Sequence, residues 1–436
     1  MRAAVVLFTR DLRLHDNPTL RAALDEAETI LPLFVLDDGM GRTRYGAASN
    51  RRSFLLESLA DLDASLRTTG AALDVSTGAV VAETVKAARR VGAEAVFCSA
   101  DVSPYARERE RRLAAEVDLR LVDTSYVVAA GEVAPASSTH YQVFTPYYRA
   151  WLQAWRGEPL GTPRTVRLPE GATTKPPPAT QSSALVPGGE RTGSQLARTW
   201  LRNGLSGYDK SHDELGADAT SRLSPYIHFG CVSPRALAVR AREKRGVAFV
   251  RQLGWRDFYA QLLWGQPQTT TENLRPRDDR WVDDDLLLTA WKNGCTGYPL
   301  VDAGMRQLRE EGWMHNRARL VVASFLVKDL GIDWREGAGH FFDLLLDGDV
   351  AQNIGNWQWV AGTGVDTRPN RIFNPTLQLR RLDPQGTYVK RYVPELADVP
   401  VKDVAEPGLL APDYPPQIVD HAEAVRAFRA RRGSGS

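Results

Sequence analysis

The chain has 436 residues, of which 43% are hydrophobic and 25% charged, and its formal net charge is +2. This length exceeds what one hydrophobic core usually organises, so we expect two domains with enough material to enclose a cofactor. No apolar run approaches the roughly 20 residues that span a bilayer, and the N-terminus lacks the layout of a signal peptide. We therefore expect a cytoplasmic protein that does not enter a membrane.

The cysteines and the charge pattern narrow the class of protein further. Cys98, Cys231 and Cys295 are isolated, with no CxxC or metal-ligand spacing, so we expect neither disulfides nor a metal site. Basic residues gather in the C-terminal half, which is typical either of a nucleic-acid-binding patch or of solvated helix faces. They are Arg306, Arg309, Arg317, Arg319, Arg368, Arg371, Arg380, Arg381, Lys390 and Arg391.

The first 130 residues have the rhythm of an α/β domain. Short β-rich runs (AAVVLF, ILPLFVL, AEAVFCS and LRLVDT) alternate with helical stretches at 51–67 and 80–90. This alternation predicts a parallel, Rossmann-like sheet over residues 1–130. No GxGxxG follows the first run, where Thr9, Arg10 and Asp11 stand instead, so the usual dinucleotide-binding loop is not supported.

The rest of the chain predicts a linker and a helical domain. Residues 158–191 are rich in Pro, Gly, Ser and Thr without apolar periodicity, so we expect an inter-domain linker over 131–194. Apolar residues then recur at helical spacing, which predicts a mostly α-helical domain over 195–432. Residues 433–436 have the composition of an appended tail.

Three features of the second domain carry chemistry. Eight of the eleven tryptophans fall between Trp255 and Trp359 among polar and charged residues, which is typical of the walls of a cofactor and substrate site. Ser224 followed by Pro225 predicts a capped helix start, where a phosphate could bind. Asp347, Asp349 and Asn353 could be metal ligands, a solvated turn or partners of buried arginines, although no further ligand completes a metal set.

Several long motifs resemble one protein family. GWMHNRARLVVASFLVKDLGIDWREG, followed by LLLDGDVAQNIGNWQW, is similar to the flavin-binding domain of the photolyase/cryptochrome family, and TSRLSPYIHFGCVSPR and FTRDLRLHDNP support the likeness. The resemblance covers nearly the whole chain and is strongest to the class I photolyases of cyclobutane pyrimidine dimers. It implies FAD as cofactor, UV-damaged DNA as partner, and a monomer.

The resemblance also implies where FAD binds. Asp347 would pair with Arg319 beside the flavin ring, and Asn353 would face the redox nitrogen with a neutral amide. The implied cofactor-binding residues are Tyr208, Thr220, Ser221, Arg222, Leu223, Ser224, Gln252, Arg256, Asn316, Arg319, Asp347, Asp349 and Asn353. Besides Asn353, the implied catalytic residues are an electron-hopping chain with Trp357 nearest the flavin, then Trp334, and Trp291 at the surface.

By the same resemblance, Trp255 and Trp359 would contact the lesion, because flat indoles suit unstacked bases. The implied DNA-contacting residues are His212, Gln252, Trp255, Asn316, Arg317, Trp359 and Gln378. Three positions depart from many relatives: Gln252 replaces a glutamate, Gly254 a larger aliphatic residue, and Leu320 a methionine. Histidine is expected at Asn316 in photolyases of (6-4) photoproducts.

The N-terminal domain resembles the family's antenna-chromophore domain. DVSPYARERE lacks the Asn-Glu pair of folate antennas and has Tyr105 and Ala106 there, so we expect 8-hydroxy-5-deazaflavin, with Arg51 and Asp101 as contacts. Folate, or a domain without a chromophore, is the alternative.

The resemblance therefore predicts a photolyase in which light drives an electron from reduced FAD to a cyclobutane pyrimidine dimer. The alternatives are a cryptochrome-like photoreceptor, against which Asn353 counts, a (6-4) photolyase, and a flavoprotein that binds nucleic acid without catalysis.

Overall fold

The computed structural model describes residues 1–39, 48–155, 157–180, 185–277 and 279–432. By the density of contacts between Cα atoms, the chain divides into two compact units. Unit 1 comprises Met1–Asp209 and Ser221–Pro267, and unit 2 comprises Lys210–Thr220 and Gln268–Ser436. This division does not coincide with the limits predicted at residues 130 and 195, and the predicted tail at 433–436 lies outside the described residues.

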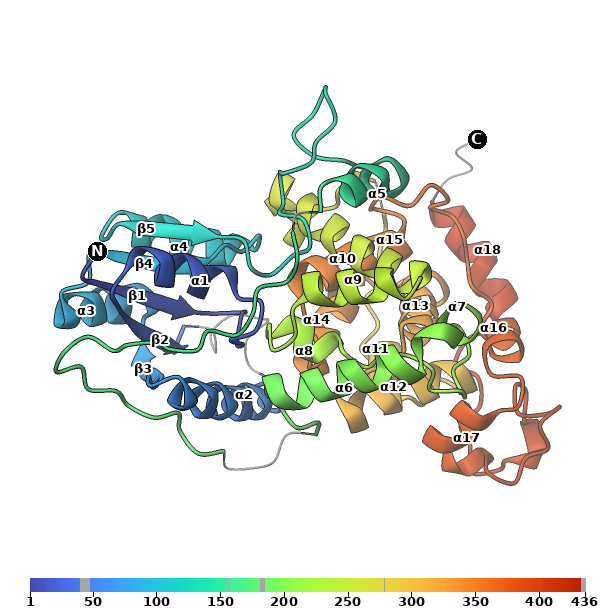
Figure 1. The fold of residues 1–436 in the computed structure, drawn as a ribbon. Helices are drawn as coiled ribbons and strands as arrows, with labels where there is room; N and C mark the ends of the chain where they lie inside the picture. The colour runs from blue at the N-terminus through green and yellow to red at the C-terminus, as the bar shows by residue number, and fades with distance from the viewer. Residues whose placement is uncertain (40–47, 156, 181–184, 278, 433–436) are drawn as a thin grey trace. The chain divides into compact units, whose positions relative to one another are not determined.

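A five-stranded parallel sheet forms the centre of the N-terminal part of unit 1 (Figure 1). Its strands are β1 (Ala3–Phe8), β2 (Thr29–Asp37), β3 (Asp74–Gly78), β4 (Ala95–Ser99) and β5 (Leu119–Val122), in the order β3-β2-β1-β4-β5. Val5 of β1 pairs with Leu31 of β2 and with Val96 of β4. Every residue of β1 is buried, so this central strand is covered on both faces. The predicted parallel α/β fold is confirmed.

Helices surround this sheet and continue beyond it. The helices α2 and α3 match the two predicted helical stretches, and α3 packs against β1, β2 and β3. One helix, α5, lies inside the predicted linker. The helical elements of unit 1 are α1 (Pro18–Glu26), α2 (Ser49–Thr68), α3 (Val80–Val91), α4 (Pro104–Ala114), α5 (Phe144–Gln153), α6 (Glu190–Asn203), η2 (Leu205–Gly207), α8 (Ser224–His228), α9 (Pro234–Glu243) and α10 (Val247–Gly265).

Unit 2 is helical in the part that the structure describes. Its long helix α12 contacts α11, α13, α16 and α17, and α14 packs on α15. The elements are α11 (Asp285–Asn293), α12 (Pro299–Glu311), α13 (Asn316–Ser324), the π-helical turn η4 (Phe325–Asp329), α14 (Trp334–Leu344), α15 (Val350–Ala361), α16 (Pro375–Leu382), α17 (Thr387–Tyr392), η5 (Pro394–Leu396), η6 (Gly408–Leu410) and α18 (His421–Arg431). The short elements α7 (Tyr208–Ser211) and η3 (Pro267–Thr270) cross the limits between the units.

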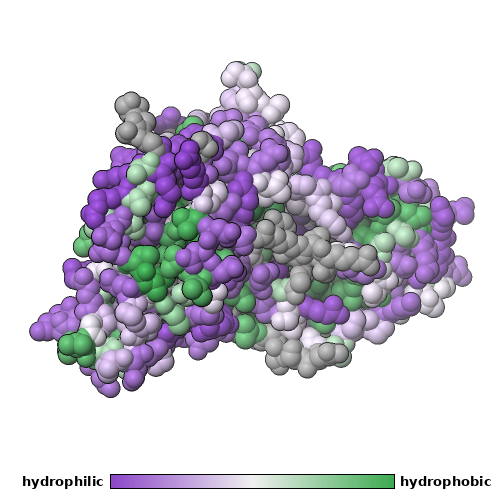
Figure 2. Space-filling model, turned by 180° about the vertical axis from the view of Figure 1, so that it is seen from behind, coloured by the Kyte–Doolittle hydropathy of each residue, from purple (hydrophilic) through white to green (hydrophobic). Residues whose placement is uncertain are grey.

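Two further features of the described residues concern membranes and metal ions. On the face seen in Figure 2, hydrophilic residues predominate and hydrophobic residues gather in separate patches. None of the helices in the described ranges is long and apolar enough to cross a bilayer. The same described residues include no group of three or more His, Cys, Asp and Glu side chains placed to hold a metal ion.

Candidate functional site

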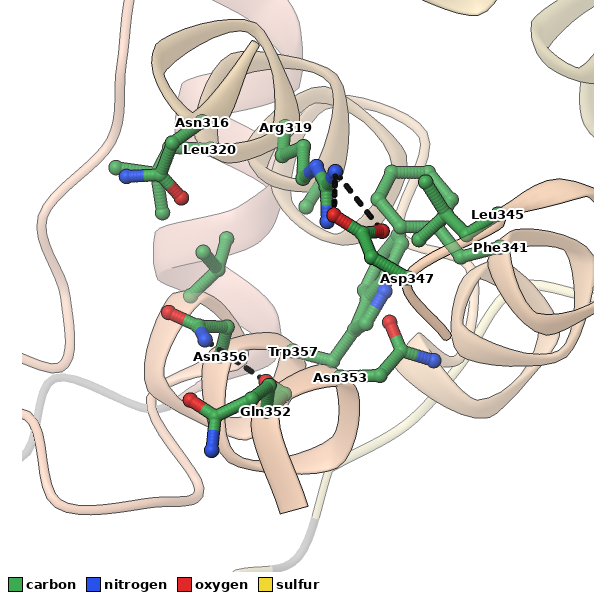
Figure 3. Close-up of a pocket in the computed structure, with 12 residues that line it drawn as sticks. Asn316, Arg319, Leu320, Phe341, Leu345, Asp347, Gln352, Asn353, Asn356 and Trp357 are labelled. Atoms are coloured by element: carbon green, nitrogen blue, oxygen red, sulfur yellow. Dashed lines mark hydrogen bonds and ion pairs between the residues drawn. The ribbon is translucent and has the colours of Figure 1, made fainter. Parts of the chain in front are cut away.

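A pocket in unit 2 brings together residues from α13, α14 and α15 and from the segment between the last two helices (Figure 3). It contains about 450 Å³ of empty space, part of which is open to solvent. Its lining is Asn316, Arg319, Leu320, Ala323, Phe341, Leu345, Asp347, Gln352, Asn353, Asn356, Trp357 and Val360. Four predicted cofactor residues, Asn316, Arg319, Asp347 and Asn353, therefore lie around one pocket.

An ion pair forms one side of this pocket. The Nη2 group of Arg319 donates to both carboxylate oxygens of Asp347, at 3.1 Å and 2.8 Å, and the predicted pairing is confirmed. The Nε group of Arg319 donates to the Met314 carbonyl at 2.8 Å, which fixes the guanidinium. Because Asp347 is only 8% exposed, loss of Arg319 would leave a buried charge without its partner.

Asn353 presents a neutral amide to the same pocket. It lies in the first turn of α15, which Asp349 caps by accepting a hydrogen bond from the Gln352 N–H at 3.0 Å. The amide nitrogen of Asn353 donates to the Ala338 carbonyl at 3.0 Å. This bond fixes the orientation of the side chain, and its oxygen is directed into the pocket (Figure 3). Asp349 thus acts as a helix cap, and its predicted contact with the cofactor stays a prediction.

Trp357 forms the floor of the pocket beside Asn353. Its ring is 2% exposed and lies 5.0 Å from the ring of Phe341, centroid to centroid. A Cβ atom at Gly337 of α14 would lie 2.1 Å from Cη2 of Trp357, so only glycine leaves room for this indole. Its Nε1 group has no hydrogen-bond acceptor among the described residues.

The entrance to α13 carries a histidine that stays uncharged. Burial and the nearby Arg319 lower the pKa of His315 to about 4, so the ring is neutral at pH 7. Its Nδ1 atom accepts a hydrogen bond from the Arg317 N–H at 3.1 Å and caps the helix. The fixed positive charge at this end of α13 therefore comes from the arginines, and Arg317 Nε donates to Asp213 at 2.6 Å.

The predicted electron-hopping chain needs one correction. Trp291 is 0% exposed, and its indole N–H donates to the Val322 carbonyl, so its predicted place at the surface is wrong. Its ring lies 6.1 Å from that of Trp357. Trp334 is also fully buried, and its indole donates to Asn273 at 3.0 Å. Trp281, to which the sequence analysis gave no role, is partly exposed and adjoins Val282, whose N–H donates to the Gly331 carbonyl.

Several predicted cofactor residues belong to unit 1. Helix α8 begins at Ser224, as predicted, but Leu223 is the cap residue and no side chain caps the helix, so the prediction of Ser224 as the cap is wrong. Arg222 has a φ of +49°, a conformation that costs a non-glycine residue energy and is often found at functional sites. Ser221 Oγ accepts from the Leu223 N–H at 3.3 Å. Tyr208 packs edge-on against Trp200.

Within the predicted phosphate-binding segment Thr220–Ser224, Thr220 belongs to unit 2 and the four residues after it to unit 1. Its hydroxyl oxygen is buried and has no hydrogen-bond partner among the described residues. A buried hydroxyl normally has a partner, so this atom fits a position that a ligand completes.

Three predicted residues lie next to one another on α10 in unit 1. Gln252 is exposed and Trp255 is partly exposed. The Trp255 ring stacks on Phe144 of α5 at a centroid distance of 3.7 Å. Arg256 donates from Nη1 to the Ser125 carbonyl at 2.8 Å, so the structure gives this arginine a partner within unit 1.

The remaining predicted DNA contacts are in unit 2. His212 lies 3.2 Å from Asp213, next to Arg317. Trp359 is partly exposed, with the guanidinium of Arg371 at 5.8 Å from its ring. Gln378 is partly exposed on α16. The structure therefore leaves these side chains accessible to a partner.

The predicted antenna contacts flank the C-terminal edge of the sheet. Asp101 follows β4 and forms an ion pair with Arg10, which follows β1, at 3.3 Å. Ligands of open α/β sheets bind at this edge, where the strand order reverses. Arg51 is buried near the start of α2, and residues 40–47 before it lie outside the described residues.

Gln352, Asn356 and Phe341 also line the pocket and were missed in the sequence analysis. Gln352 and Asn356 are four residues apart on α15 and so share a helix face, a signal that the spacing to Asn353 could have given. Together the pocket offers an ion pair, amide groups and an aromatic floor, which fits a planar heterocycle with polar edges such as a flavin.

Two family models match this chain. One, described as the FAD binding domain of DNA photolyase, matches residues 249–433, and the other, described as DNA photolyase, matches residues 4–167. A deoxyribodipyrimidine photo-lyase of Streptomyces griseus is 50% identical over 455 aligned positions, which cover 99% of this chain and 100% of the relative.

Solved structures of two photolyases and a cryptochrome also superimpose on nearly the whole chain. A bacterial class III photolyase from Agrobacterium tumefaciens superimposes with a TM-score of 0.90 at 31% identity, over 99% of this chain and 97% of that chain. A Synechocystis cryptochrome also reaches 0.90, at 29% identity over 99% of both chains. An archaeal photolyase from Sulfolobus tokodaii with two FAD molecules reaches 0.87, at 31% identity over 98% of this chain and 99% of that chain.

Proposed function

Because the chain belongs to the DNA photolyase family, we propose that it is a deoxyribodipyrimidine photo-lyase that binds FAD and repairs cyclobutane pyrimidine dimers in UV-damaged DNA. The observation that carries this proposal is the pocket lined by Arg319, Asp347, Asn353 and Trp357, inside the region that matches the FAD-binding model. FAD, when bound, supplies the light-absorbing electron donor.

The residues of the pocket suit a cofactor that must hold an extra electron. Arg319 and Asp347 neutralise each other, so their pair offers polar groups at little net charge. Asn353 is neutral, and its oxygen can accept a hydrogen bond without adding a negative charge next to an electron-rich ring. We propose that these three side chains orient the flavin and hold its electrostatic environment nearly neutral.

We propose that Trp357 and Trp334 pass electrons toward the cofactor and that Trp281 replaces Trp291 as the surface end of the chain. The support is exposure: Trp281 is partly exposed, whereas Trp291 is sealed from solvent. The segment next to Trp281 is hydrogen-bonded at Gly331, three residues before Trp334.

For the lesion, we propose contacts from Trp255 and Gln252 of unit 1, and from Trp359, Asn316, Arg317, Gln378 and His212 of unit 2. Asn316 lines the pocket and is exposed, so an amide rather than an imidazole stands at this edge of the site. This supports cyclobutane dimers over (6-4) photoproducts, whose repair is associated with histidine in this segment.

We further propose an 8-hydroxy-5-deazaflavin antenna at the C-terminal edge of the sheet, with Asp101 and Arg51 as contacts and folate as the alternative. The ion pair of Asp101 with Arg10 places both signs of charge at that edge. A cytoplasmic location and a monomeric state complete the proposal, and fractionation and sedimentation of the purified chain would test them.

A cryptochrome-like photoreceptor is the second candidate, because a cryptochrome superimposes as well as a photolyase. A repair assay separates the two. Reduced protein is illuminated with oligonucleotides that contain either one cyclobutane dimer or one (6-4) photoproduct, and restored thymines are counted. We expect repair of the cyclobutane dimer; repair of the (6-4) lesion alone, or of neither lesion, contradicts the proposal.

A further inference from the structure

A continuous row of aromatic rings runs along α5 and ends on α10, within unit 1. Phe144 stacks on Trp255 at a centroid distance of 3.7 Å and an interplanar angle of 5°. Tyr148 stacks on Phe144 at 5.3 Å and on Trp151 at 5.6 Å. Trp151 meets Trp155 edge-on at 5.0 Å. These five residues are called the aromatic row, and Trp255 at its end is the proposed lesion contact.

Gly254 makes this row possible. A Cβ atom at Gly254 would lie 2.7 Å from Cδ2 of Tyr148 and 2.8 Å from its Cε2. Any larger side chain at this position would therefore push the Tyr148 ring away from α10. In this chain the Tyr148 ring fills the space that a side chain at position 254 would occupy.

Two arginines lie over the row. The guanidinium of Arg251 lies 5.0 Å from the Phe144 ring centre and 5.6 Å from that of Tyr148. The guanidinium of Arg242, on α9, lies 5.2 Å from the ring of Trp155. Cation–π contacts of this kind hold a guanidinium in place while its N–H donors stay available.

Among the described residues, neither of these two arginines has a carboxylate partner. Both residues are exposed. Arg240, two residues before Arg242 on the same helix, does pair with Glu243, at 3.2 Å. Arg242 and Arg251 thus differ from Arg240: their guanidinium groups contact aromatic rings instead of a carboxylate.

We propose that Arg242 and Arg251, held by the aromatic row, bind phosphates of the damaged DNA strand next to the lesion. This inference rests on the proposed function, because Trp255 joins the row to the lesion contact. Guanidinium groups suit phosphate oxygens through paired hydrogen bonds.

The salt dependence of binding tests the proposal. The logarithm of the binding constant for single strands falls with the logarithm of salt concentration, by about 0.7 for each phosphate contact. We expect the double variant Arg242→Gln/Arg251→Gln to lower the slope by about 1.4, on single-stranded oligonucleotides with and without a dimer. Arg240→Gln is the matched control and should leave the slope unchanged, because its charge is already paired.

A second variant tests the role of the rings. Tyr148→Leu keeps every charge but removes the ring beside Arg251, and it should weaken binding about two- to fivefold, the scale of one exposed cation–π contact. Circular dichroism and melting curves verify that each variant is folded. If Tyr148→Leu does not fold, the arginine variants alone decide.

The outcomes separate this inference from the proposed function. An unchanged slope in the double variant, an equal fall in Arg240→Gln, or full affinity in folded Tyr148→Leu overturns the role of the row. A wild-type protein that binds DNA with the expected slopes but does not repair dimers in light contradicts the proposed function and leaves phosphate binding standing. A wild-type protein that binds no oligonucleotide contradicts both.

Discussion

At the scale of single residues, Asn353 determines the charge of the pocket. Its amide nitrogen donates to the Ala338 carbonyl, so the side chain is fixed and uncharged beside the pair of Arg319 and Asp347. A carboxylate at this position would face a carbonyl oxygen and add a negative charge next to Asp347. Asparagine and aspartate have nearly the same size, so the amide nitrogen that donates to Ala338 is the feature that matters at this position.

The substitution Asn353→Asp tests this account. We expect the free energy of unfolding to fall by about 1–3 kcal/mol, because a buried acceptor loses its donor, and we expect FAD retention to fall. Urea unfolding and the ratio of released flavin to protein measure the two effects. Asn203→Asp, at the exposed last residue of α6 and outside the pocket, is the control, and an equal loss in both variants would argue against a special role for Asn353.

His340 provides a prediction for pH. Burial, followed by the nearby Lys292 and Arg309, lowers the pKa of this ring from 6.5 to about 4. Between these values the unfolded chain binds a proton that the folded chain does not, so stability contributed by the neutral ring is lost as pH falls from 6.5 to 4.

Replacement of the His340 ring should reduce the dependence of unfolding free energy on pH between pH 6.5 and pH 4. Between pH 6.5 and pH 4, titration of His340 should cost the wild type on the order of 2–3 kcal/mol of unfolding free energy, at about 1.4 kcal/mol per pKa unit. His340→Leu lacks this ring and should not show that loss. Denaturant unfolding at a series of pH values measures the difference. A constant offset between the two proteins across this range would show that His340 does not titrate as described.

The tryptophans give a prediction about electron supply. Replacement of Trp357, Trp334 or Trp281 by Phe should slow photoreduction of oxidised FAD and leave repair by already reduced enzyme largely intact, because the proposed electron-hopping chain supplies the flavin and is not on the route to the lesion. Transient absorption and the repair assay report the two activities separately. Slow photoreduction in Trp291→Phe together with a normal rate in Trp281→Phe would restore the original assignment of Trp291.

At the scale of helices, the contact between α14 and α15 sets the shape of the pocket. Gly337 lies against Trp357, with a Cβ atom excluded at 2.1 Å from the indole. In Gly337→Ala the clash should outweigh the gain in helix propensity of about 1 kcal/mol, so we expect a net loss of about 1–3 kcal/mol in unfolding free energy. Gly161→Ala, where a Cβ would meet no atom within 4 Å, is the control.

A melting temperature for both variants decides this point. If Gly337→Ala is as stable as the wild type and Trp357 keeps its fluorescence spectrum, the close contact between α14 and α15 does not constrain the pocket. An equal loss in both variants would point to a general effect of added methyl groups.

Elements with a continuous apolar run or with helical periodicity could be predicted from the sequence, and short or polar elements could not. The run AAVVLF forms β1, and the stretches at 51–67 and 80–90 lie in α2 and α3. The strand β3 was missed because its sequence, DVSTG, is mostly polar, and α5 because it lies in a segment assigned to a linker. Both depend on contacts with distant parts of the chain: β3 pairs with β2, and α5 packs on α10.

The same distinction applies to the site. The family motifs were enough to predict that Arg319 pairs with Asp347, because both lie in long matching segments. The burial of Trp291 and the stacking of Trp255 on Phe144 were not predictable, because exposure and ring contacts depend on residues more than 30 positions away in the sequence.

At the scale of the whole molecule, two units share the predicted chemistry. Unit 1 contains the sheet, the aromatic row and Trp255, and unit 2 contains the pocket with its ion pair and amides. The family models cover both ends of the chain, residues 4–167 and 249–433. A photolyase needs both a cofactor site and a DNA surface, and the chain supplies candidate residues for each.

The most direct test of the central claim is light-dependent repair by the purified chain. The protein, reconstituted with FAD and reduced, is mixed with DNA that contains a single cyclobutane thymine dimer and divided between light and darkness. The account predicts that intact thymines reappear in the illuminated sample and not in the dark one. Protein that retains FAD and binds the DNA but restores no thymines in light would contradict it.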